Sequence, residues 1–176
     1  MMHYNTISTF CKRRIVNAVT PTIKILVGTM TGNAERVADE IELALEARAQ
    51  VETLDMDRLT PAVFDGDAIF LICSSTYGQG DVPDNARDFY RILGEARPDL
   101  RQVRYGVISL GDMTYPQTFA NGGKRFDAIL AELGAQRLGE LFCHDASTGT
   151  FPEEEALPWA QEWLNLVEES MLVPQV

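Results

Sequence analysis

An uninterrupted apolar run, Ala68–Cys73, limits most strongly what this chain can fold into. The run is too short for a buried helix and fits a β-strand whose two faces are both covered. From Ile23 onward, short apolar runs alternate with segments that have the periodicity of amphipathic helices. This alternation predicts an α/β fold, a doubly wound five-stranded parallel sheet with helices on both faces and right-handed crossovers.

The predicted boundaries follow from periodicity and turn residues. Asp84 is the expected N-cap of the second helix, and Gly134 is the expected stop of the third. Pro158 should lie in the first turn of the last helix, where a missing N–H is tolerated. Strands are predicted at 23–27, 50–54, 68–73, 103–110 and 135–138, the last continuing to Phe142, and helices at 34–49, 84–95, 119–133 and 154–169, with a helical turn at 61–64.

The first 22 residues differ in composition from the rest, because they contain three basic and no acidic side chains. A transit peptide has this composition, but we favour an accessory N-terminal extension (1–22) before one domain (23–170) and a short tail (171–176). No apolar run approaches the roughly 20 residues that a transmembrane helix requires. We therefore expect a cytoplasmic protein with no membrane partner.

Charge and cysteine content narrow the function classes further. The net charge of −11 and the isoelectric point of about 4.6 disfavour nucleic acid and favour a basic protein partner, although acidity that merely confers solubility explains them too. Cys11, Cys73 and Cys143 are odd in number and far apart, which argues against a disulfide framework and a metal site. Cys73 is the expected buried thiol.

The loop after the first predicted strand, 29–35, has the features of a phosphate site. It joins a buried strand to a helix N-terminus, where backbone N–H groups and the helix dipole favour an anion. Thr31 and Asn33 add donors, and Gly32 allows close approach. The loop contains no Lys or Arg, so hydrogen bonds should neutralise the phosphate. It matches neither a Walker nor a dinucleotide-binding loop; an ordinary strand–helix turn is the alternative.

Two further loops each supply an aromatic side chain at the end of a buried strand. Tyr77 lies in 74–85 beside Gly78 and Gly80, and Tyr115 lies in 110–116. Two aromatic rings at adjacent strand ends predict a slot for a flat ring. A mobile loop with a surface tyrosine is the alternative for each loop alone.

These stretches resemble the flavodoxin family, especially the FMN domains of diflavin reductases and the small flavodoxins close to them. Segment 29–35 resembles T-x-T-G-x-[AT]-E, 75–85 resembles [ST]-T-[YH]-G-x-G-[DE]-x-x-D-N, and 110–115 resembles G-L-G-[ND]-x-x-Y. Segment 133–137 resembles the family's segment that leads into the last strand of the core. The resemblance, which covers 23–169, implies a flavodoxin-like sheet of order 2-1-3-4-5 with FMN as cofactor at its switch point.

The resemblance also implies roles for individual residues. The first loop would hold the FMN phosphate, Tyr77 would line one side of the isoalloxazine ring, and Tyr115 would stack on the other. The carbonyl of Gly78 would turn toward the reduced ring. No catalytic or metal-ligating residue is implied. The predicted cofactor-binding residues are Thr29, Met30, Thr31, Gly32, Asn33, Ala34, Ser75, Thr76, Tyr77, Gly78, Gln79, Gly80, Leu110, Gly111, Asp112, Tyr115, Phe119 and Asp145.

The implied function is a low-potential carrier of single electrons. Asp81, Asp112 and Asp145 should line the slot and disfavour an anionic reduced flavin. In diflavin reductases the loop after the fifth strand is strongly acidic; here Asp145 keeps the charge and His144 is new, which affects the potential and its pH dependence.

The expected partners are two basic redox proteins, namely a separate NADPH-dependent flavodoxin reductase and an electron acceptor. The chain itself is expected to be a monomer. Two alternatives stay open, an FMN-dependent NAD(P)H:quinone oxidoreductase and a flavin-free signalling or interaction domain. From the sequence we favour an electron-transfer protein over an enzyme with a substrate of its own.

Overall fold

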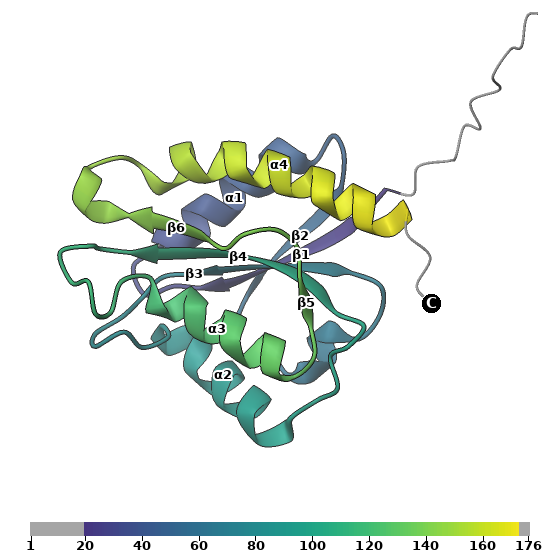
Figure 1. The fold of residues 1–176 in the computed structure, drawn as a ribbon, viewed down its shortest axis with the longest axis horizontal. Helices are drawn as coiled ribbons and strands as arrows, with labels where there is room; N and C mark the ends of the chain where they lie inside the picture. The colour runs from purple at the N-terminus through teal and green to yellow at the C-terminus, as the bar shows by residue number, and fades with distance from the viewer. Residues whose placement is uncertain (1–19, 173–176) are drawn as a thin grey trace, which may run out of the picture.

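A parallel sheet forms the centre of the computed structural model, which describes residues 20–172 (Figure 1). Its strand order is β2-β1-β3-β4-β5, with β6 also paired to β4, so the predicted order is confirmed. All of these pairings are parallel. The strands are β1 (Thr22–Gly28), β2 (Gln50–Asp55), β3 (Ile69–Ser74), β4 (Arg104–Gly111), β5 (Gln136–Arg137) and β6 (Phe142–Asp145).

Two helices cover each face of the sheet (Figure 1). Along β3, Leu71 and Cys73 pack with α1 and α4, whereas Phe70 and Ile72 pack with α2 and α3. Both faces of this strand are therefore buried, which explains its uninterrupted apolar run. The helices are α1 (Asn33–Leu45), α2 (Asp84–Ala96), α3 (Asn121–Glu132) and α4 (Pro152–Leu172), with short 3-10 turns η1 (Pro61–Phe64) and η2 (Ala146–Thr148).

The prediction of one continuous fifth strand is wrong, because the segment is broken into β5 and β6. The chain leaves the ladder after Leu138, whose carbonyl accepts a hydrogen bond from Nε1 of Trp163 at 3.1 Å. Gly139 then takes a positive φ of 73°, which turns the backbone away from the strand direction. It is β6 that returns to β4 and brings Phe142–Asp145 to the carboxyl end of the sheet.

Helix caps and boundaries also differ from the prediction, and α1 ends at Leu45 instead of at residue 49. Pro83, not Asp84, is the N-cap of α2, and Asp84 is its first residue. The segment before Asn121 forms turns, so α3 begins later than Phe119. Helix α4 begins at Pro152, which leaves Pro158 in its interior rather than its first turn. Pro158 is exposed, and water there can hydrogen-bond a carbonyl that lacks its helical donor.

Residues 20–172 also bear on the predictions about Cys73, membrane-spanning helices and the terminal segments. Cys73 is fully buried, as predicted, and burial raises the pKa of its thiol to about 12. Within this range, no helix is both long and apolar enough to span a bilayer. The predicted extension and tail lie outside the described residues except for 20–22 and 171–172; Thr22 already belongs to β1 and α4 continues to Leu172.

The contact between Gly106 and Trp163 generates a stability prediction. A Cβ added at Gly106 would lie 2.6 Å from Cε2 of the buried Trp163 ring, so the indole would have to move and lose its bond to Leu138. We expect Gly106→Ala to lower the free energy of unfolding by about 2–4 kcal/mol, measured by urea denaturation.

A matched control is Gly94→Ala on α2, where an added Cβ meets Ile129 at an ordinary 3.7 Å. Its stability should be unchanged or raised by up to about 1 kcal/mol, because Gly is unfavourable in helices. Equal stabilities of the two variants would contradict the close-packing argument.

Candidate functional site

A cleft of about 600 Å³ lies at the carboxyl ends of β1, β3, β4 and β6, the end toward which the arrowheads point in Figure 1. Parallel α/β sheets bind ligands at this end. Most of the predicted cofactor-binding residues come together here from three separate loops. The lining residues are Met30, Thr31, Asn33, Arg36, Ser75, Thr76, Tyr77, Gly78, Leu110, Gly111, Asp112, Tyr115, Thr118, His144, Ala146, Gly149, Thr150, Phe151 and Pro152.

The loop between β1 and α1 forms one end of the cleft. Gly32, the N-cap of α1, has a φ of 83° and, as a glycine, has no side chain to cap the first N–H groups of the helix. The first N–H groups of the helix are thus available to an anion. Thr29 shapes the turn, since its Oγ1 accepts from the N–H of Gly32 at 3.0 Å and its own N–H donates to Asn85 at 2.8 Å.

Arg36 adds a positive charge that the loop sequence lacks. It lies in the first turn of α1, one residue beyond the predicted phosphate loop, and lines the cleft. Helical geometry brings the fourth residue of α1 back beside the turn that precedes the helix. An anion at this end of the cleft would therefore meet a guanidinium in addition to hydrogen-bond donors.

The segment after β3 presents Tyr77 above a tight turn. Its N–H donates to the carbonyl of Asp81 at 2.9 Å, and its carbonyl accepts from the N–H of Gly80 at 3.1 Å. Gly78 has a φ of 52°, a value that side chains disfavour, and an added Cβ would meet nothing within 4 Å. Tyr77 is 43 % exposed. The turn thus holds one aromatic ring at the edge of the cleft.

Ser75 offers a hydroxyl whose bonding capacity is unused. Its Oγ is buried and has no hydrogen-bond partner among the described residues, although Ser75 lines the cleft. The next residue is fixed, because Oγ1 of Thr76 accepts from the N–H of Gly122 at 3.0 Å. Buried polar atoms are nearly always paired, so the Ser75 hydroxyl indicates a position where a ligand supplies the partner.

The segment after β4 carries Tyr115, which is 65 % exposed. Hydrogen bonding to Asp145 of β6 holds this segment in place. Oδ1 of Asp145 accepts from the N–H of Met113 at 2.8 Å and from that of Ser147 at 3.0 Å. The bond from Met113 is the main reason why the pKa of Asp145 is lowered. Asp145 therefore positions the loop that bears Tyr115.

The cleft is less acidic than predicted. Of the three carboxylates expected to line it, only Asp112 does. Asp81 lies 3.3 Å from the guanidinium of Arg125 in an ion pair, and Asp145 is engaged by backbone N–H groups. The distribution of net charge along the chain did not reveal these local partners.

Several predicted site residues lie behind the lining rather than on it. Ala34 is buried and its carbonyl accepts from the Cys73 thiol at 3.4 Å. Phe119 is half-buried behind Gly111, with the ammonium of Lys124 5.1 Å from its ring centroid. The predicted residues that do not line the cleft are Thr29, Gly32, Ala34, Gln79, Gly80, Phe119 and Asp145.

The prediction missed most of the wall between β6 and α4. His144, Thr150 and Phe151 line the cleft there, and Phe151 is 59 % exposed. The loop after the fifth strand was expected to be functional, and an aromatic residue within it was the available signal. The other lining residues absent from the prediction are Arg36, Thr118, Ala146, Gly149 and Pro152.

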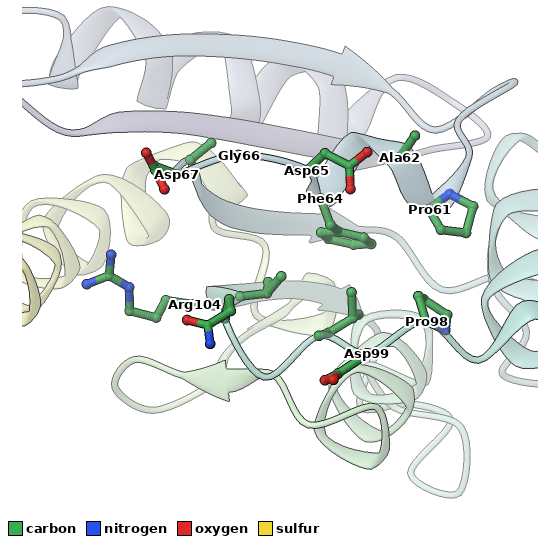
Figure 2. Close-up of a pocket in the computed structure, with 13 residues that line it drawn as sticks. Pro61, Ala62, Phe64, Asp65, Gly66, Asp67, Pro98, Asp99 and Arg104 are labelled. Carbon is green, nitrogen blue, oxygen red and sulfur yellow. The ribbon is translucent and has the colours of Figure 1, made fainter. Parts of the chain in front are cut away.

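A second hollow, of about 630 Å³, lies where β3 and β4 begin, and thus at the opposite end of the sheet. Figure 2 shows Phe64 on its wall, with Asp65, Asp67 and Asp99 around it. Asp99 is bonded to Arg101, and Arg104 is bonded to Ser170 at the end of α4. This hollow contains none of the predicted site residues.

The cleft is suited to a ligand with a phosphate at one end and a flat ring at the other. The N-terminus of α1 and Arg36 favour the anion. Tyr77 and Tyr115 offer two aromatic faces, and Ser75 offers an unpaired hydroxyl. These features fit riboflavin 5′-phosphate, which combines both chemical groups.

Comparison with known proteins agrees with this geometry. The family model described as Flavodoxin matches residues 25–159. Flavodoxin YqcA of Escherichia coli (strain K12) is 42% identical over 82% of this chain and 97% of its own length. NADPH–cytochrome P450 reductase of Oryctolagus cuniculus is 35% identical over 80% of this chain and 21% of its own length. A solved mutant of flavodoxin from Pseudomonas aeruginosa superimposes with a TM-score of 0.73 at 32% identity, covering 82% of this chain and 97% of that one.

The anchoring by Asp145 generates a pH prediction. Because the pKa of Asp145 is lowered in the folded chain, the stabilisation is complete above the ordinary carboxyl pKa and is lost as the pH falls through the lower, folded value. We expect the amide proton shift of Met113 to titrate with a midpoint below the ordinary aspartate value of about 3.9, measured by NMR.

Asp145→Asn should abolish this titration. Asp99→Asn is the matched control, since Asp99 also has a lowered pKa, but it is bonded to Arg101. A Met113 titration that survives in Asp145→Asn would contradict the assignment.

Proposed function

The chain belongs to the flavodoxin family, and we propose that it carries single electrons at low potential between a separate reductase and an acceptor protein. FMN is its cofactor. Bound FMN supplies the redox chemistry by taking up and releasing electrons. The observation that carries the proposal is one cleft that combines a helix N-terminus for a phosphate with two exposed tyrosines for a flat ring.

In this proposal the phosphate lies at the start of α1. Thr31 and Asn33 line the cleft there and supply side-chain donors, and the uncapped helix N-terminus supplies backbone N–H groups. The side chain of Arg36 contributes charge. An anion bound in this way is oriented as well as neutralised, because each donor has a fixed direction.

The ring lies between the segments after β3 and β4. Tyr77 and Tyr115 supply aromatic faces, and their exposed fractions leave area for a ligand to cover. Gly78 lines the cleft, and because a glycine backbone rotates easily, its peptide can turn its carbonyl toward the ring. The hydroxyl of Ser75 pairs with a polar atom of the ligand.

Electrostatics supports a low potential and a basic partner. The net charge is −11, and Asp112 lines the cleft, so each added electron is disfavoured. About 1.4 kcal/mol of such disfavour lowers a one-electron potential by about 60 mV. The same charge steers a basic reductase and acceptor toward the cleft in short, salt-sensitive encounters. We further propose that the chain acts in the cytoplasm as a monomer.

The central test is stepwise reduction of the purified protein. We expect it to bind FMN more tightly than riboflavin, because the phosphate site contributes. Electrochemical titration should resolve two one-electron potentials, and NADPH alone should not reduce the protein until a flavodoxin reductase is added.

Two results would favour the alternatives. Rapid NADPH oxidation by the purified chain alone would indicate a quinone oxidoreductase. Failure to bind FMN at micromolar concentration would indicate a flavin-free interaction domain.

A second test concerns Tyr115. Loss of aromatic stacking typically costs about 1–3 kcal/mol, so Tyr115→Ala should raise the Kd for FMN by about 5- to 150-fold. The measurement is quenching of FMN fluorescence by the apoprotein. Leu43→Ala, at an exposed apolar position on α1, is the control and should leave the Kd unchanged. Equal affinities would show that Tyr115 does not stack on the cofactor.

A further inference from the structure

His144 is a buried titratable side chain in the cofactor cleft for which the proposed function has no role. It is only 2 % exposed, yet it lines the cleft. In the ladder between β4 and β6 it lies opposite Leu110, another lining residue. Paired residues of neighbouring strands point to the same face of a sheet. The imidazole therefore lies between the sheet and the start of α4.

Glu155 holds the ring through one nitrogen. Oε2 of Glu155 lies 3.0 Å from Nδ1 of His144, and Oε1 accepts from the hydroxyl of Thr150 at 2.5 Å. The bond from Thr150, and then that from His144, lowers the pKa of Glu155. Glu155 is thus ionised at neutral pH and can only accept hydrogen bonds. Nδ1 of His144 must carry its hydrogen, which leaves Nε2 as the nitrogen that gains or loses a proton.

Charged side chains from several elements face His144 or share the cleft with it. Glu155 approaches from α4, and Asp145 follows His144 on β6. Asp112, after β4, lines the same cleft. Arg36 of α1 is the opposing positive charge on the lining. Of these groups, Glu155 and Asp145 are the two carboxylates that interact with the imidazole.

We propose that His144 takes up a proton from solvent at Nε2 when bound FMN becomes more negative on reduction, and so couples the lower reduction potential to pH. The inference rests on the proposed function. The electron comes from the reductase, the proton comes from water, and no other bond is made or broken. Glu155 is the positioning residue, because it directs the proton to Nε2.

The coupling has a defined electrochemical signature. A nearby negative charge favours the protonated imidazole, so reduction raises the pH at which His144 loses its proton. Between the titration midpoints of the one-electron-reduced and fully reduced states, the lower potential falls by up to about 59 mV per pH unit for one electron. Outside that interval His144 contributes no pH dependence.

The first experiment follows the ring directly. The chain has 2 histidines, His3 and His144, so the FMN-bound protein labelled with ¹³C-histidine gives two ring signals that His144→Asn assigns. We expect the titration midpoint of His144 to rise by about one pH unit or more on full reduction with dithionite. The signal of His3 is the internal reference. An unchanged midpoint for His144 would overturn the proposal.

The second experiment measures the lower one-electron potential from about pH 5 to about pH 9, the range around the ordinary histidine pKa. His144→Asn keeps a donor toward Glu155 but removes the titrating nitrogen, so the slope assigned to His144 should vanish. Glu155→Gln offers an amide hydrogen to Nδ1, which moves the ring hydrogen to Nε2. Its sloping region should shift to lower pH by about one unit. Glu162→Gln, exposed on the same helix, is the matched control and should behave as the parent protein.

The outcomes distinguish a failure of this inference from a failure of the proposed function. Two resolved one-electron potentials with the same pH slope in the parent protein and His144→Asn would overturn the coupling alone. Absence of FMN binding or of two one-electron steps in the parent protein would overturn both. If His144→Asn does not fold, the sloping region of Glu155→Gln still decides the question.

Discussion

Burial of β3 on both faces is the constraint on which the rest of the structure depends. Ile69–Ser74 is fully enclosed, with alternate side chains packed against the two helical layers. A strand in this position forces parallel neighbours and helical crossovers. Parallel strands end at the same edge of a sheet, so loops far apart in the sequence meet there. The cofactor cleft is a consequence of how the core is covered.

Close packing then fixes how these loops approach one another. An added Cβ at Gly122 would collide with the carbonyl of Ser75, so a glycine is required where the start of α3 meets the loop after β3. Gly122 also donates to the hydroxyl of Thr76. Asp145 and Asn85 make equivalent bridges between other loops of the cleft. The residues that present aromatic rings are thus supported by neighbours that do not themselves line the cleft.

The local charge pattern is finer than the net charge suggests. Acidic composition favours a low potential and basic partners, but Asp81 is paired with Arg125 and Asp145 is engaged by backbone donors. Arg36 brings a cation to the phosphate end. The buried His144, held by Glu155, adds the group that we propose responds to the charge of the cofactor. In the proposed function, the potential therefore depends on these few contacts as well as on the net charge.

The sequence by itself determined the strand and helix succession, the apolar core of β3, and the loops that carry Tyr77 and Tyr115, because these follow from local periodicity and turn chemistry. The family resemblance added the strand order. Only the tertiary structure decided the break between β5 and β6, the place of Arg36 in the cleft, and the contact of His144 with Glu155. Each of these features depends on where one element packs against another. The spacing of residues along the chain does not determine how close two separate elements lie in the folded protein.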